Sequence, residues 1–311
     1  MSAQIFIKKE TQGVYGKHPS ERTPEELIKC GIVNLDKPKG PTSHQVSDYA
    51  QNILHITKAG HSGTLDPQVT GVQPIGLGRA TRITEFLLTA PKEYVGIMHL
   101  HQPIEESLLH AGVQKFIGKI KQLPPIKSAV KREVRIREIY EFELLEIKGQ
   151  EVLFRVKCQA GTYIRKLCHD LGQELGIGAH MAELRRTQAG PFTEKDNLVT
   201  LNDLDDAYHF YKEENNDKFI KYCLQPAEAA LIYIPKCWVL DSAIISITHG
   251  RDLAIPGVCK LENFRKEEVV AIMSLKGELV AIGDAQMSAV EINTKDKGIA
   301  VKVKKVFIDT D

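Results

Sequence analysis

A rigidly held carboxylate is the first candidate for chemistry in this sequence, and it lies in the loop 58–67, which ends in Asp66-Pro67. Gly60 and Gly63 permit backbone angles that are closed to other residues, and Pro67 biases Asp66 away from helical geometry. A reacting group needs such a fixed position. An ordinary turn, in which Asp66 only bonds to its own backbone, has the same composition. Local composition alone favours the turn.

A serine nucleophile is a second candidate, because Gly60-His-Ser-Gly-Thr64 is similar to the nucleophile elbow of hydrolases. That elbow requires glycine two positions after the serine, and Thr64 occupies this position. His169 and Asp170 would have to complete a triad, but adjacent residues point to different sides of a helix. The sequence therefore disfavours a hydrolase.

The cysteines offer no metal site, since none of them forms a CxxC or CxxH pair. They are Cys30, Cys158, Cys168, Cys223, Cys237 and Cys259. Scattered cysteines are expected to be small apolar core residues. The chain has no apolar run long enough to span a membrane, and its first residues lack the apolar region of a signal peptide. We therefore expect a cytoplasmic protein that holds no metal.

Overall charge does not indicate nucleic-acid binding, because 41 basic and 40 acidic residues give a net charge of +1. Any such contact must come from local patches. One patch is the basic run 127–137, whose cations are Lys127, Lys131, Arg132, Arg135 and Arg137. A solvated strand or loop face would have the same composition, so charge alone leaves both interpretations open.

The elements that must position these groups follow from periodicity. An apolar strand from residue 31 leads through a Pro/Gly turn to a helix that begins with the capping-box pair Thr42 and Gln45. Residues 92–100 and 139–158 have the composition of strands. A second helix opens near Gly161, and its expected buried stripe consists of Ile164, Leu167, Cys168, Leu171 and Leu175.

The two ends of the sequence differ from its middle in composition and in the pattern of apolar residues. Residues 8–28 are polar and contain Gly and Pro, so they are expected to form an irregular lead-in. From Ile232 onward, short β-like runs alternate with turns that carry Gly257, Gly277 and Gly298. This pattern predicts a small barrel-like module after the main domain.

Five motifs in series identify a family. They are Asn34-Leu-Asp-Lys-Pro-Lys-Gly-Pro-Thr-Ser43, His61-Ser-Gly-Thr-Leu-Asp-Pro67, Lys92-Glu-Tyr94, Gly161-Thr-Tyr-Ile-Arg165 and Glu183-Leu-Arg-Arg-Thr187. Together they resemble the TruB-like pseudouridine synthases. The branch that the chain resembles is the dyskerin type in its archaeal form, the catalytic subunit of H/ACA guide-RNA particles. The segments that indicate this branch are Lys127-Ser-Ala-Val-Lys-Arg132, Leu167-Cys-His-Asp170 and Gly178-Ala-His-Met181.

The resemblance implies an α/β (α+β) catalytic core, built around a mixed or antiparallel sheet, at residues 31–230. A small β-barrel-like PUA domain would follow at 231–306, and the N-terminal segment 1–30 would pack against it. The PUA-like segments are Thr248-His-Gly250, Ile255-Pro-Gly257 and Gly298-Ile-Ala300. Because this domain grips the ACA end of the guide RNA in dyskerin-type enzymes, the resemblance implies RNA contacts at His249, Gly250, Pro256 and Gly257.

The resemblance also assigns roles at the site. Asp66 would be the nucleophile and Arg165 its ion-pair partner, which agrees with an arginine placed unfavourably near a helix N-terminus. Tyr94 would stack on the flipped-out base and help to remove its C5 proton. Attack of Asp66 at C1′, attack at C6 and assisted elimination all remain open.

The remaining residues would support the substrate. Tyr163 and Leu184 match residues that line the pocket. His61 lies in the loop that meets the displaced nucleotide, and Lys37 in a turn that supports the active-site loop. A purely structural role fits Lys37 and His61 equally well. The basic run 127–137 falls where the family carries a loop over substrate RNA.

The implied function is the isomerisation of uridine to pseudouridine in ribosomal RNA, directed by H/ACA guide RNA and assisted by small protein subunits. The T-loop uridine of transfer RNA is a further expected substrate. No cofactor is expected, because the reaction imports no group and oxidises nothing. The alternative is a non-catalytic RNA-binding scaffold of the same particle. One residue departs from the family pattern: Gln73 replaces an apolar residue and, if buried, needs a hydrogen-bond partner.

Overall fold

The computed structural model describes residues 4–123, 131 and 133–308. The chain forms two compact units. The terminal unit comprises Met1–Ile32, Gly76–Arg82 and Leu224–Asp311, and the central unit comprises Val33–Ile75 and Ile83–Cys223. The domain boundaries expected from the sequence thus differ from this division mainly at 76–82 and 224–230, which belong to the terminal unit.

The central unit is built around one mixed sheet. Its strands run in the order β2-β4-β9-β5-β8-β7-β6, with β3 on β4 and β10 on β9. The strands are β2 (Gly31–Lys37), β3 (Ala59–His61), β4 (Thr70–Leu77), β5 (Lys92–Leu100), β6 (Gly118–Gln122), β7 (Arg135–Lys148), β8 (Glu151–Cys158), β9 (Ala179–Ala189) and β10 (Phe192–Thr193). The helices are α2 (Ser43–Ile53), α3 (Thr84–Thr89), α4 (Glu106–Gln114), α5 (Ile164–Glu174), α6 (Leu201–Glu213) and α7 (Lys218–Cys223). Since β4 and β9 are parallel and β5 is antiparallel to both of its neighbours, the predicted mixed α/β core is confirmed.

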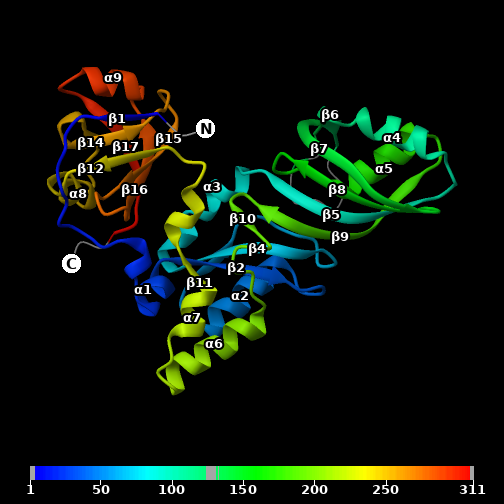
Figure 1. The fold of residues 1–311 in the computed structure, drawn as a ribbon, viewed down its shortest axis with the longest axis horizontal. Coiled ribbons are helices and arrows are strands. Elements are labelled where there is room, and N and C mark those ends of the chain that lie inside the picture. The colour runs from blue at the N-terminus through cyan, green and yellow to red at the C-terminus, as the bar shows by residue number, and fades with distance from the viewer. Residues whose placement is uncertain (1–3, 124–130, 132, 309–311) are drawn as a thin grey trace. The chain divides into compact units, whose positions relative to one another are not determined.

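Helices α4 and α5 pack on one face of this sheet (Figure 1). Four residues of the predicted α5 stripe are buried there, namely Ile164, Leu167, Cys168 and Leu171. The strand β5 has the bounds predicted for it, and β7 and β8 form a hairpin that turns at Gly149, whose φ is +60°. The capping box at the start of α2 is also present, with Gln45 N donating to Thr42 Oγ1 at 3.2 Å.

The terminal unit contains the small β-rich domain. Its seven-stranded sheet has the order β1-β14-β12-β15-β16-β17-β13. The strands of this sheet are β1 (Ile5–Ile7), β12 (Lys236–Val239), β13 (Leu253–Ala254), β14 (Val258–Glu262), β15 (Val269–Met273), β16 (Leu279–Ala285) and β17 (Ile299–Val306). Strand β11 (Leu224–Pro226) also belongs to this unit but lies outside the seven-stranded sheet. The α-helices are α1 (Pro24–Lys29), α8 (Asp241–Thr248) and α9 (Ala289–Thr294). The 3₁₀ turns are η1 (Pro19–Glu21), η2 (Gly78–Arg82), η3 (Ala227–Leu231) and η4 (Ile255–Gly257).

The N-terminal segment is an ordered part of this unit. Strand β1 pairs antiparallel with β14, with Phe6 opposite Leu261. The expectation of an irregular lead-in over 8–28 is wrong beyond residue 18, because η1 and α1 lie there. Helix α1 has a capping box formed by Thr23 and Glu26 with Pro24 at its first position, a signal that the sequence contains.

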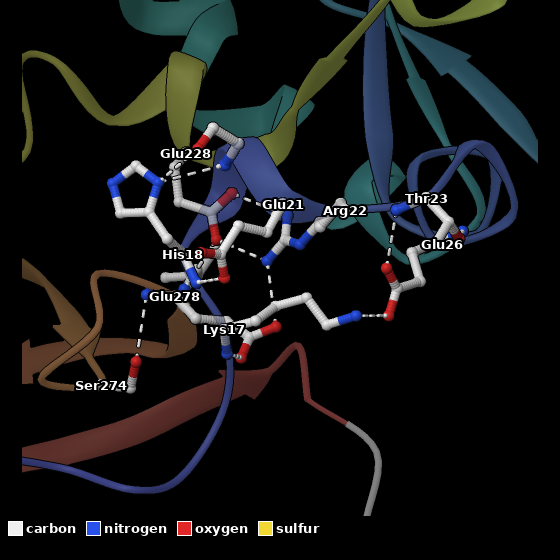
Figure 2. A network of polar contacts seen from close by, with 11 residues as sticks. Lys17, His18, Glu21, Arg22, Thr23, Glu26, Glu228, Ser274 and Glu278 are labelled. Atoms are coloured by element: carbon white, nitrogen blue, oxygen red, sulfur yellow. Dashed lines mark hydrogen bonds and ion pairs between the residues drawn. The ribbon is translucent and has the colours of Figure 1, made fainter. Parts of the chain in front are cut away.

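An ion-pair cluster fixes this segment within the terminal unit, as Figure 2 shows. The Arg22 guanidinium binds both carboxylate oxygens of Glu228, at 2.8 and 2.7 Å, and donates to Glu278 at 3.2 Å. Glu228 also accepts from the backbone N–H of Leu279 at 2.7 Å. Three segments distant in sequence therefore meet at one arginine.

All six cysteines are free and buried, which confirms their expected place in the core. In the part of the chain that the structure describes, no three His, Cys, Asp or Glu residues are grouped so that they could hold a metal ion. None of the described helices is both long and apolar enough to cross a membrane.

Candidate active site

A pocket of about 620 Å³ opens in the central unit, beside the end of the Asp66 loop. Ligand pockets are typically of this size. Its walls come from the Asp66 loop, β5, β9 and the start of α5, and its lining residues are Gly63, Thr64, Leu65, Asp66, Val69, Leu88, Lys92, Tyr94, Gly161, Thr162, Tyr163, Ile164, Arg165, Met181, Leu184 and Arg186.

The pocket brings together five of the predicted site residues, which are Asp66, Tyr94, Tyr163, Arg165 and Leu184. The Arg165 guanidinium forms an ion pair with the Asp66 carboxylate. Both side chains stay about half exposed, at 56% and 52%, so the pair is accessible to a ligand. Arg165 therefore finds its partner across the pocket, 99 positions away in the sequence.

The start of α5, which carries Arg165, is fixed by the buried side chain of Gln122 at the end of β6. Gln122 Nε2 donates to the Tyr163 carbonyl at 3.1 Å, and its Oε1 accepts from the Tyr163 N–H at 3.0 Å. This reciprocal pair sets the first turn of the helix and so the direction of Arg165. Arg137, predicted to bind RNA, donates to the Gly161 carbonyl at 3.0 Å just before this turn.

Lys37 is not among the residues that line the pocket, but its side chain is hydrogen-bonded to the backbone of the Asp66 loop. Its side chain is fully buried, and its Nζ donates to the carbonyls of Pro38, Pro67 and Val69 at 2.9, 3.2 and 2.9 Å. Burial, and secondly the charge of Arg186, lower the pKa of Lys37. Two of its three bonds reach residues that follow Asp66, so Lys37 connects the turn after β2 to the loop that carries the carboxylate.

Gln73 is buried and has the partners that its position demands. Its Oε1 accepts from Ser43 Oγ at 2.8 Å, and its Nε2 donates to the Ser43 carbonyl at 3.1 Å. Ser43 Oγ in turn accepts from the N–H of Leu65 at 2.8 Å. The glutamine therefore orients a serine that holds the residue next to Asp66.

Two cations of the pocket, Lys92 and Arg186, are missing from the sequence-based set of site residues. Lys92 is 5% exposed and donates to the carbonyls of Leu87, within α3, and of Ala90, directly after α3, at 2.6 and 2.8 Å. Arg186 is 1% exposed. Both residues belong to family motifs in the sequence, Lys92-Glu-Tyr94 and Glu183-Leu-Arg-Arg-Thr187, but the resemblance assigned neither of them to the pocket.

The alternation of side chains between the two faces of β9 could have identified Arg186 as a residue of the pocket. Leu184 and Arg186 lie two positions apart and share the face towards the pocket, whereas Arg185 lies on the other face. Arg185 makes surface ion pairs with Asp36 at 2.8 Å and Glu194 at 2.6 Å. Arg185 is therefore a surface residue, and Arg186 is a residue of the pocket.

The other predicted contacts that the structure describes are not among the residues that line the pocket. His61 ends β3, and burial, then Arg186, then His44 lower its pKa. In the basic run, Lys127 and Arg132 lie outside the described residues. Lys131 pairs with Glu133, and Arg135 donates to the backbone carbonyl of Lys131.

The predicted RNA contacts of the terminal unit lie around helix α8. His249 caps α8, with Nδ1 2.7 Å from the Ile245 carbonyl oxygen, and Gly250 follows with a φ of +82°. Pro256 and Gly257 line a hollow of about 360 Å³ beside α8. Contact of these four residues with guide RNA stays a prediction.

Because Lys92 is buried, we expect the free energy of unfolding to depend measurably on pH. Burial, with Arg186 as second cause, lowers its pKa from 10.5 to about 8. Because its pKa is lower in the folded than in the unfolded chain, the unfolded chain binds more protons between these pH values, and the free energy of unfolding rises with pH there. Between pH 7 and 9.5, this group should add about 2 kcal/mol.

Urea unfolding of wild type and Lys92→Met, followed by circular dichroism at both pH values, isolates this contribution. The difference in unfolding free energy, wild type minus variant, should grow by that amount as the pH rises. A difference that stays constant would show that Lys92 carries its charge as easily in the folded protein as in water.

Comparisons with known proteins cover the whole chain. Residues 51–164 match the TruB family pseudouridylate synthase N-terminal domain, and 165–232 match the tRNA pseudouridylate synthase B C-terminal domain. Residues 235–307 match the PUA domain, and 3–47 match the DKCLD (NUC011) domain. The PUA match lies within the terminal unit.

Individual relatives and structures agree with these matches. A probable tRNA pseudouridine synthase B of Methanothermobacter thermautotrophicus is 53% identical, over 99% of this chain and 96% of its own. One from Thermococcus kodakarensis is 53% identical, over 98% of this chain and 90% of its own.

Two solved structures have the same fold. The crystal structure of the archaeal box H/ACA sRNP Nop10-Cbf5 complex has a TM-score of 0.92 and 48% identity, covering 100% of this chain and 97% of that one. The structure of an H/ACA RNP bound to a substrate RNA containing 2'-deoxyuridine gives 0.94 and 47%, covering 100% and 96%. The motif-based resemblance is confirmed, and the chain belongs to the TruB family of pseudouridylate synthases, in the form related to the archaeal H/ACA proteins.

Proposed function

We propose that this protein is the catalytic subunit of an H/ACA guide-RNA particle and converts uridine to pseudouridine in ribosomal RNA. The observation that carries the proposal is the accessible Asp66–Arg165 pair in a pocket with Tyr94. The similarity to the H/ACA structures, which extends over the whole chain, supplies the context of guide and substrate RNA.

The pocket suits a single flipped-out nucleotide. An enzyme that acts on a base must take it out of its stack, which costs a few kcal/mol. An aromatic ring returns part of that energy by stacking, about 1–3 kcal/mol per base. Tyr94 and Tyr163 offer rings in the pocket, and Leu184 and Met181 offer apolar walls.

The charge of the pocket suits RNA. Asp66 is its one carboxylate among the lining residues, against the three cations Lys92, Arg165 and Arg186. This excess of positive charge favours the phosphates that flank the target nucleotide. It also favours the negative charge that the base carries when the N1–C1′ bond breaks and the bonding electrons stay with N1.

The reaction needs only rearrangement within the nucleotide. Asp66 assists the break between N1 and C1′, the base turns within the pocket, and C5 then bonds to C1′. The proton on C5 leaves to solvent, and N1 takes up a proton. Loss of that C5 proton gives a direct readout of the reaction.

Transfer RNA is a second proposed substrate, because the curated relatives carry the name tRNA pseudouridine synthase B. The solved structures contain the proteins Nop10 and Gar1, and we propose that this chain binds their counterparts. Guide RNA would contact the PUA domain around His249 and Pro256, and the particle would act in the cytoplasm. A scaffold without activity is not favoured, since Asp66, Arg165 and Tyr94 share one pocket.

A tritium-release experiment tests the proposal. The particle is reconstituted with its small subunits and a guide RNA, and supplied with a ribosomal RNA fragment labelled at C5 of the target uridine. Release is expected with the matched guide and not with a guide mismatched at the target. A third arm offers a transfer RNA labelled in its T-loop, without guide. No release in any arm would overturn the proposal.

A further inference from the structure

Arg186 is a buried cation at the pocket whose role the reaction described above does not explain. It belongs to β9, is 1% exposed, and still reaches the pocket lining. Desolvation of a charge is costly, so a buried arginine is retained only where its contacts compensate for that cost or its charge has a use.

The strands hold Arg186 opposite Tyr94. A bulge in the pairing of β5 with β9 lies between Glu93 and Tyr94, and it places Tyr94 directly across from Arg186. On the other side, β4 approaches closely at Gly71, where a Cβ atom would lie 2.2 Å from the Arg186 carbonyl oxygen. The backbone on both sides therefore fixes where the Arg186 side chain begins.

Among the described residues, the Arg186 guanidinium is hydrogen-bonded to backbone carbonyls and to no carboxylate. Nε donates to the Val72 carbonyl at 2.7 Å, and a terminal nitrogen lies 3.4 Å from the Gly63 carbonyl in the Asp66 loop. Within the described part of the chain, no acidic side chain forms an ion pair with it, and Tyr94, directly opposite Arg186 in the pairing of β5 with β9, lines the same pocket. Burial raises the pKa of Tyr94, and the charge of Arg186 opposes that rise.

Hydrogen-bond chemistry gives a contact between these two side chains a direction. A guanidinium can only donate, so the Tyr94 oxygen accepts, and its own hydrogen must point elsewhere. Both side chains line the pocket, so the pocket is a direction in which this hydrogen can point. A hydroxyl that accepts from a cation is also a better donor, because the two hydrogen bonds polarise each other.

We propose that Arg186 is a positioning residue that acts through Tyr94, orienting its hydroxyl as a hydrogen-bond donor to the uracil while the base is detached from C1′. The proposal rests on the proposed function and adds a second task for Tyr94 beyond stacking. The bonding electrons of N1–C1′ stay with the base, so its oxygens gain negative charge at that stage and accept more strongly. The same guanidinium contacts Gly63, which ties support for the base to the Asp66 loop.

A double-mutant cycle tests the proposal in the reconstituted particle, with single-turnover tritium release as the readout. The proteins are wild type, Tyr94→Phe, Arg186→Met and the double variant. Tyr94→Phe keeps the stacking ring and should slow release roughly 10- to 100-fold, the loss expected for a charge-assisted hydrogen bond. Arg186→Met should slow it at least as much, and the double variant should be no slower than Arg186→Met alone.

Control variants separate this role from a structural one. Arg185→Met removes the neighbouring surface arginine, and its rate should stay within about twofold of wild type. Arg186→Lys keeps a charge and should recover part of the rate only when Tyr94 is present. RNA affinity should fall only slightly in the Arg186→Met proteins, which lose one pocket charge, so the main effect should lie in the rate and not in binding.

Three results would overturn the proposal. One is an equal effect of Arg186→Met with and without the Tyr94 hydroxyl, which would show that the arginine acts on the fold alone. Another is a Tyr94→Phe protein with the wild-type rate, and this result needs no arginine variant to fold. The third is full recovery by Arg186→Lys in the Tyr94→Phe background. Absence of release from wild type would instead count against the proposed function.

Discussion

Replacement of Asp66 by asparagine is expected to slow pseudouridine formation by about 10⁴-fold or more, as removal of a catalytic nucleophile does in other enzymes. The amide has the same shape as the carboxylate but no charge, and it cannot attack the nucleotide or stabilise a cation at C1′. Single-turnover tritium release measures the effect. The guide-RNA and substrate affinities should be unchanged or slightly tighter, since a negative charge next to RNA is removed.

The fold should tolerate this change. Asp66 and Arg165 are about half exposed, and an exposed pair contributes about 0–1 kcal/mol to stability. The matched control is Asp36→Asn, which removes an aspartate bonded to both terminal nitrogens of Arg185 at 2.9 and 2.8 Å, away from the pocket lining. This control should keep the wild-type rate. Undiminished release from Asp66→Asn would exclude Asp66 as the reacting group.

Arg22→Met is expected to destabilise the terminal unit by about 3–5 kcal/mol, the typical loss when one partner of a buried ion pair is removed. Arg22 is 8% exposed, and its partners Glu228 and Glu278 are 11% and 18% exposed. Without the guanidinium, two largely buried carboxylates remain side by side with no cation between them. They then either repel each other or take up a proton.

Fluorescence offers a convenient probe, because Trp238 is the only tryptophan of the chain and lies in β12 of the terminal unit. Urea unfolding followed at this residue should show the loss. The control is Lys17→Met, which breaks the neighbouring pair with Glu26, exposed at 40% and 38% (Figure 2). It should cost about 0–1 kcal/mol. If Arg22→Met and Lys17→Met lose the same unfolding free energy, the Arg22 cluster stabilises the terminal unit no more than an exposed ion pair does.

The sequence predicted those parts of the fold that depend on local signals. The Thr42–Gln45 capping box, the bounds of β5 and the buried stripe of α5 each follow from residues a few positions apart. The same kind of signal was present at Thr23-Pro24, but the surrounding polar composition led to the wrong expectation of an irregular segment there.

The parts that could not be predicted depend on contacts between distant residues. Alternation places Arg186 on the face of Leu184 and Arg185 on the other face, but the burial of Arg186 follows only from the pairing of β9 with β4 and β5. Gln73 posed the same problem, because its partner Ser43 is 30 positions away. Asp66 itself was identified through the ordered set of motifs, and the composition of its loop favoured an inert turn.

The Arg22 cluster has a consequence for biosynthesis. The residues of β1 and the turn at Arg22 leave the ribosome well before their partners Leu261, Glu228 and Glu278, which lie more than 200 positions further along the chain. Contacts so far apart along a chain form slowly. In the nascent chain, β1 therefore stays unpaired while the central unit is synthesised and begins to fold. The edge of this strand is exposed to other chains during that time.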